Sequence, residues 1–115
     1  MTLKGIRWWA VGLLLVGSAH ATDWRMLDGD GIAAALTDKT LRFAAATQTF
    51  YASGRTLYDA GRPSWGRWRV EGDRYCSVWP PAGDWACYDV ALHTHGTRVR
   101  FSGGGDNVST GTYVD

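Results

Sequence analysis

Beyond Thr40, apolar and polar residues alternate in short runs that are separated by turn-forming residues. This alternation is typical of strands with one buried face. The predicted strands cover residues 47–51, 55–58, 65–70, 75–79, 85–92, 98–101 and 112–114. The links between them are too short for parallel crossovers, so neighbouring strands should be antiparallel. The pattern predicts a mainly β fold, an antiparallel meander or small barrel-like sheet of about six to seven strands.

One short helix is expected before the strands. Asp28 is a suitable N-cap, and Ile32, Ala35 and Leu36 follow the i, i+3, i+4 spacing of a buried helical face. We expect this helix to lie across an open end of the sheet.

The same alternation sorts the strand residues into two faces. Arginines occupy one face of two strands, at positions 67, 69, 98 and 100, and should be solvated. The opposite face should form the core, with Trp68, Val70, Tyr88, Val90, Leu92, Val99 and Phe101.

Two cysteines define one hairpin. Cys76 and Cys87 lie equally far from a turn at residues 80–83, where Pro and Gly favour a type I turn. This register also places Tyr75 opposite Tyr88. Directly opposed cysteines are within bridging range, so a Cys76–Cys87 disulfide is predicted.

The first 21 residues have the features of a secretory signal peptide. Lys4 and Arg7 precede a short apolar stretch at 8–16, and Ala19-His20-Ala21 provides a small-x-small cleavage site. We therefore expect a periplasmic or secreted protein, with residues 22–115 forming a single disulfide-linked β-domain and no membrane span after cleavage. An oxidising compartment agrees with the predicted disulfide.

Cleavage before Thr22 is directly testable. The intact mass of protein recovered from the periplasm should equal that of residues 22–115 with two fewer hydrogens for the disulfide. Full-length protein, or protein confined to the cytoplasm, would contradict both the cleavage and the compartment.

Charge argues against a nucleic-acid partner. The whole chain carries a net charge of +1, and loss of Lys4 and Arg7 leaves ten basic against eleven acidic residues. A nucleic-acid-binding surface requires a basic excess.

Catalytic motifs are weak. The serines do not stand in a G-x-S-x-G motif, and the Gly103–Gly105 run lacks the lysine of a P-loop. His93 and His95 would share one face of a strand, and Asp89 lies on the same alternation, so a metal-dependent enzyme is a less favoured alternative. The other interpretation is two exposed histidines at a strand end. We expect no enzyme and no cofactor.

Aromatic residues provide the remaining signal for binding. Trp65, Trp79 and Trp85 lie at or beside turns, and Arg67 and Arg69 flank them. Exposed tryptophans with arginines are typical of a binding platform. The alternative is that these rings only cover the ends of the sheet or the disulfide.

Three segments together resemble a known group of proteins: residues 65–70 (WGRWRV), 75–79 (YCSVW) and 86–90 (ACYDV). They are similar to small exported alphaproteobacterial proteins with a G-x-W-x-V strand, a C-x-x-W segment and a following C-Y-x-V. The resemblance implies a small periplasmic β-domain of unknown function. Such proteins are sometimes labelled dihydrodipicolinate reductase, but this chain lacks the glycine fingerprint that binds a nicotinamide cofactor.

The sequence therefore favours a binding or envelope-associated module. Its partner would be a protein, a peptide or a small ligand of the cell envelope. The alternative is a domain like the bacterial metalloprotease inhibitors, in which the mature N-terminus, Thr22-Asp23-Trp24, would enter the protease cleft.

Overall fold

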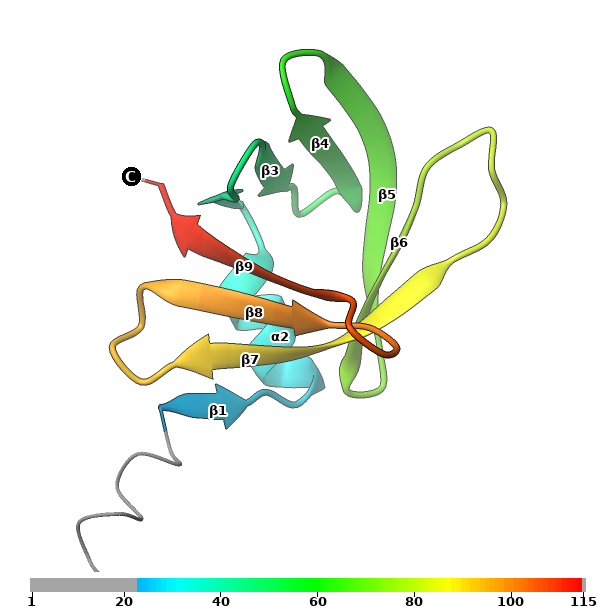
Figure 1. Cartoon of the computed structure of the whole chain (residues 1–115). Coiled ribbons are helices and arrows are strands. Elements are labelled where there is room, and N and C mark those ends of the chain that lie inside the picture. The colour runs from blue at the N-terminus through cyan, green and yellow to red at the C-terminus, as the bar shows by residue number, and fades with distance from the viewer. Residues whose placement is uncertain (1–22, 115) are drawn as a thin grey trace, which may run out of the picture.

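The computed structural model describes residues 23–114 as one antiparallel barrel with a short helix (Figure 1). The predicted signal peptide and its cleavage site lie outside these residues. In chain order the elements are β1 (Trp24–Met26), α2 (Gly29–Leu36), β2 (Lys39–Arg42), β3 (Thr47–Phe50), β4 (Arg55–Asp59), β5 (Pro63–Glu71), β6 (Arg74–Val78), β7 (Ala86–His93), β8 (Arg98–Ser102) and β9 (Val108–Tyr113).

Strands β2 to β9 close into an eight-stranded barrel. The sheet order is β1-β7-β6-β5-β4-β3-β2-β9-β8, and a further pairing between β7 and β8 closes the barrel. β1 is an extra strand on β7, where Trp24 pairs with His93 and Met26 with Ala91. The mainly β, antiparallel, barrel-like fold is thus confirmed, but with nine strands instead of about six to seven.

The two unpredicted strands are β1 and β2, which are three and four residues long. In β2 only Leu41 is buried, so no alternation can be recognised in it. Both strands are defined by their hydrogen-bonded neighbours more than by their own sequence.

Helix α2 lies at one end of the barrel, as the sequence predicted. The Asp28 carboxylate accepts a hydrogen bond from the Gly31 N–H at 2.8 Å, and Ile32, Ala35 and Leu36 are buried. The Gly29 N–H donates to the Asp73 carboxylate at 2.8 Å, which ties the helix to the β5–β6 turn.

The centre of the core is an aromatic cluster around Phe50, which is fully buried. Its ring centroid lies 5.7 Å from those of Trp68 and Tyr75 and 6.2 Å from that of Phe101. The Trp68 indole N–H donates to the Tyr51 carbonyl oxygen at 2.9 Å. The buried indole therefore has its polar atom satisfied.

Most of the predicted core is confirmed. Trp68, Val90, Val99 and Phe101 are buried, and Val70, Tyr88 and Leu92 pack against them while partly exposed. The buried residues that were not predicted include Leu41, Phe50 and Tyr75.

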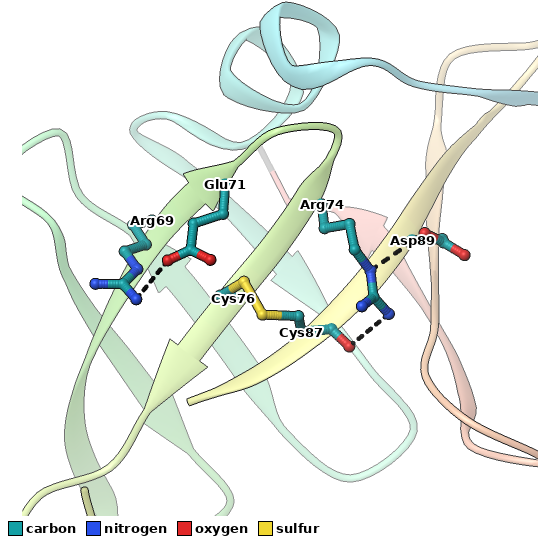
Figure 2. The surroundings of a disulfide bond; sticks show 6 residues. All are labelled: Arg69, Glu71, Arg74, Cys76, Cys87 and Asp89. Carbon is teal, nitrogen blue, oxygen red and sulfur yellow. Dashed lines mark hydrogen bonds and ion pairs between the residues drawn. A yellow bond between two sulfur atoms is a disulfide. The ribbon is translucent and has the colours of Figure 1, made fainter. Parts of the chain in front are cut away.

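The predicted disulfide joins Cys76 and Cys87 across β6 and β7 (Figure 2). Tyr75 pairs with Tyr88, as expected from the same register. The predicted type I turn at 80–83 is wrong. The turn begins one residue earlier, the Ala82 N–H donates to the Trp79 carbonyl oxygen at 3.1 Å, and the Pro80–Pro81 peptide is cis.

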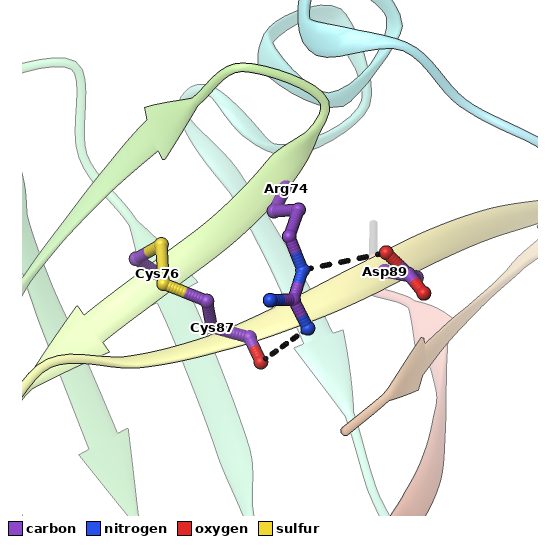
Figure 3. Close-up of polar contacts among 4 residues, drawn as sticks. All are labelled: Arg74, Cys76, Cys87 and Asp89. Atoms are coloured by element: carbon purple, nitrogen blue, oxygen red, sulfur yellow. Dashed lines mark hydrogen bonds and ion pairs between the residues drawn. A yellow bond between two sulfur atoms is a disulfide. The ribbon is translucent and has the colours of Figure 1, made fainter. Parts of the chain in front are cut away.

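Polar contacts surround the disulfide on the outside of the barrel. Figure 3 shows Arg74 donating to the Cys87 carbonyl oxygen at 3.1 Å and approaching the Asp89 carboxylate at 3.4 Å. Arg69 and Glu71, which both belong to β5, form a second ion pair. All four side chains are about half exposed, so these pairs contribute little to stability.

Candidate functional site: a cavity in the open end of the barrel

The barrel end opposite α2 holds a cavity of about 230 Å³. The turns β2–β3, β4–β5, β6–β7 and β8–β9 surround this end. The lining is mostly aromatic with a small polar group and consists of Phe43, Gln48, Tyr58, Tyr75, Ser77, Trp79, Tyr88, Phe101, Asn107 and Ser109. An engineered cavity of about 150 Å³ holds benzene, so this one has room for a single substituted ring.

Gln48 provides the main polar group of the cavity. It follows the inward phase of β3 together with Phe50 and is only 8% exposed. Its Nε2 donates to Thr56 Oγ1 at 3.0 Å and to the Tyr75 hydroxyl at 3.1 Å. Both amide hydrogens are therefore used within the barrel wall.

The hydrogen-bond network fixes which way the Gln48 amide faces. The Thr56 hydroxyl donates its proton to the Thr49 carbonyl oxygen at 2.8 Å, so its oxygen can only accept from Gln48. If the Gln48 amide were turned the other way, its Oε1 would face the Thr56 Oγ1, and both of these oxygens would be acceptors. No donor among residues 23–114 hydrogen-bonds to Gln48 Oε1. Gln48, which lines the cavity, therefore has a buried acceptor oxygen without a partner from the described chain.

Tyr75 extends this polar group. Burial raises the pKa of Tyr75 above that of a solvent-exposed tyrosine, whereas hydrogen bonds with Ser77 and Gln48 act in the opposite direction. The phenol is therefore neutral at physiological pH and retains its proton for hydrogen bonding. Ser77 is also buried and lines the cavity beside Tyr75.

Trp79 forms part of the cavity wall. Its indole lies against Gly66 of β5 so closely that any side chain at position 66 would collide with the ring. Tyr58 meets the same indole edge-on at 6.0 Å. Because Tyr75, Ser77 and Trp79 share one alternation, the end of β6 directs Trp79 toward the interior.

The three tryptophans of the predicted binding platform therefore do not lie on one surface. Trp79 lines the cavity, whereas Trp65 and Trp85 lie on the outer surface. The Arg55 guanidinium stacks over Trp65 at 4.1 Å, and Arg69 stacks over Trp85 at 3.8 Å.

The outer part of the platform remains partly accessible. Trp65 is 45% exposed, and Arg67 and Arg69 are also exposed. Arg67 pairs with Arg55 of β4 and with Val78 of β6 in the sheet, which places it between the two stacked pairs.

His93 and His95 lie at the opposite end of the barrel, at the β7–β8 turn. Their rings stack at 5.1 Å, and the His95 backbone N–H donates to His93 Nδ1 at 3.2 Å. Asp89, the third ligand considered, is instead near Arg74. No group of three metal-ligating side chains in residues 23–114 contains either histidine.

The predicted mature N-terminus is only partly described. Thr22 lies outside the described residues. The Asp23 carbonyl oxygen accepts from the Thr94 N–H at 2.8 Å, and Trp24 belongs to β1. The segment that an inhibitor would insert into a protease is therefore bound to the barrel from Asp23 onward.

The sequence analysis did not identify Gln48 and Ser77 as site residues. A signal was present, because Gln48 is a polar residue in the same alternation as Phe50 and within a predicted strand. A glutamine on an inward face needs hydrogen-bond partners, which marks it as a candidate for a buried polar site.

Comparison of the chain with models of known families, with curated proteins and with solved structures found no match in any of the three. In the part of the chain that the structure describes, no helix is both long and apolar enough to cross a membrane.

Proposed function

We propose that this protein is a small binding module of the cell envelope that holds one ring-containing ligand in the cavity of the barrel. The observation that carries the proposal is Gln48 Oε1, which has no hydrogen-bond partner within residues 23–114 and belongs to a mostly aromatic lining. Ligand sites in proteins commonly combine apolar walls with a few polar groups that fix orientation.

The polar group specifies one feature of the ligand. Gln48 Oε1 only accepts hydrogen bonds, so the ligand should carry a donor such as a hydroxyl or an N–H. The rings of Tyr58, Trp79 and Tyr88 would contact its apolar part. Phenols and indoles of suitable size have this combination.

The test compares two ligands of nearly the same shape, p-cresol and p-xylene. The protein should bind p-cresol about tenfold more tightly, because p-xylene leaves the buried acceptor unsatisfied at a cost of roughly 1–3 kcal/mol. Titration followed by NMR chemical shifts gives both affinities and identifies the residues that respond. With Gln48→Leu, the preference should be lost or reversed.

A second variant separates binding from folding. Ser109 lines the rim of the cavity and is exposed, so Ser109→Phe should block entry at little cost in stability. Thr110→Phe is the matched control, since Thr110 is the next residue of β9 and points outward. Equal binding of p-cresol by wild type and Ser109→Phe, or no binding of either ligand by wild type, would refute the proposed site.

A further inference from the structure

A second surface lies on the outer face of β1, β7 and β8, away from the cavity. Trp24 of β1 is half-buried, and two guanidinium groups of β8 lie over its indole, Arg100 at 4.5 Å and Arg98 at 5.3 Å. His93 meets the same indole edge-on at 5.0 Å. One aromatic ring thus holds two cations on the surface of the barrel.

The strand register brings an exposed apolar side chain to the same place. Met26 pairs with Ala91, and Ala91 pairs with Arg100 on the other side of β7. Directly paired residues point to the same face of a sheet, so Met26 and Arg100 both point outward. Met26 is 64% exposed, the largest exposed fraction among the large apolar side chains described. We call Trp24, Met26, Arg98 and Arg100 the cationic face.

Three aspartates line the surface pocket that contains Met26, but neither arginine of the cationic face forms an ion pair within residues 23–114. The ion pairs found there are Arg69–Glu71 and Arg74–Asp89, and neither involves Arg98 or Arg100. A guanidinium that lies over an indole can still donate hydrogen bonds from its N–H groups to another partner. Arg98 and Arg100 are two residues apart on one strand, so about 7 Å separates their Cα atoms.

We propose that the cationic face docks the protein onto the surface of an anionic phospholipid bilayer. Arginine binds phosphate groups in bidentate fashion, and each basic side chain near an anionic membrane strengthens its binding. Tryptophan is enriched at the headgroup level, where an apolar Met26 beside it would reach the acyl boundary. A free anion in solution would contact only the arginines, so the exposed methionine would add nothing to its affinity.

The position of the face in the chain agrees with a membrane as its partner. β1 is the first element of the described chain, and the apolar stretch 8–16 lies a short distance upstream. Before the predicted cleavage, that stretch would hold β1 close to the bilayer. After cleavage, the cationic face would keep the barrel at the same surface.

The test is co-sedimentation of the processed chain, residues 22–115, with vesicles. The barrel and its core are complete within residues 23–114, so this form retains the fold. Vesicles with about 30% phosphatidylglycerol should bind it, and neutral phosphatidylcholine vesicles should not. Raising the salt concentration from about 0.05 to 0.5 M should release it, because exposed charges are screened.

The double variant Arg98→Ala/Arg100→Ala should weaken partitioning to the anionic vesicles about 30-fold. Arg55→Ala/Arg67→Ala is the matched control, because it removes the same charge from the outer face of β4 and β5 and should retain binding within about twofold. Met26→Ser, which leaves the charge unchanged, should weaken partitioning several-fold.

Three results would overturn the proposal. One is equal loss in the two double variants, which would indicate a response to net charge alone. Another is full binding by Arg98→Ala/Arg100→Ala while its circular dichroism matches wild type. The third is retention on an acidic polysaccharide such as alginate without binding to anionic vesicles. Ser109→Phe should bind vesicles as wild type does, which separates this surface from the cavity.

Discussion

Replacement of Trp68 by alanine is expected to lower the free energy of unfolding by about 3–5 kcal/mol. The side chain is buried against Phe50 and Tyr75, and its indole N–H donates to the Tyr51 carbonyl oxygen. The truncation would leave a cavity in the aromatic cluster and an acceptor without its donor. The measurement is denaturant unfolding followed by far-UV circular dichroism. If both proteins have the same m-value, the shift of the denaturant midpoint gives the change in the free energy of unfolding.

Arg67→Ala is the matched control, since residue 67 precedes Trp68 on β5 and is exposed. Its effect should stay within about ±0.5 kcal/mol. Similar losses at both positions would mean that the assigned inward and outward faces of β5 are wrong.

The second large effect is expected from the disulfide. Replacing both Cys76 and Cys87 by serine should lower the free energy of unfolding by about 3 kcal/mol, because the unfolded chain regains the freedom of the closed loop. In a domain whose total stability is about 5–15 kcal/mol, this is a large fraction. Thermal unfolding of the variant and of oxidised wild type measures the difference.

Reduced wild-type protein provides the control for this prediction. It should unfold close to the double-serine variant, since both lack the cross-link. Thiol titration of unreduced, denatured protein should find no reactive thiol. Two reactive thiols, or a variant as stable as the oxidised protein, would contradict a stabilising disulfide.

Local patterns were sufficient to predict much of the fold. Strands such as β5 and β8 alternate large apolar residues with arginines, which fixes both their presence and their buried face. The helix cap at Asp28 and the pairing of the two cysteines could also be predicted, because each is determined by residues close together in the sequence. β1 and β2 could not be found in this way, since they are too short for a period to show.

The cavity could not be predicted from local patterns, because it depends on barrel closure. Gln48, Ser77 and Ser109 belong to β3, β6 and β9, and they line one cavity only when β2 pairs with β9 and β7 with β8. Trp79 illustrates the same limitation. Its place beside a turn suggested an outward position, whereas the continued alternation of β6 and the small size of Gly66 bring it inward.

Barrel closure has a consequence for biosynthesis. Leu41 near the beginning of the fold pairs with Tyr113 near its end, and the Tyr113 hydroxyl donates to the Ala35 carbonyl oxygen of α2 at 2.7 Å. A nascent chain that lacks β9 therefore has unpaired edges on β2 and β8 and no enclosed interior. The native barrel can therefore form only once β9 has left the ribosome and is free to pair with β2 and β8.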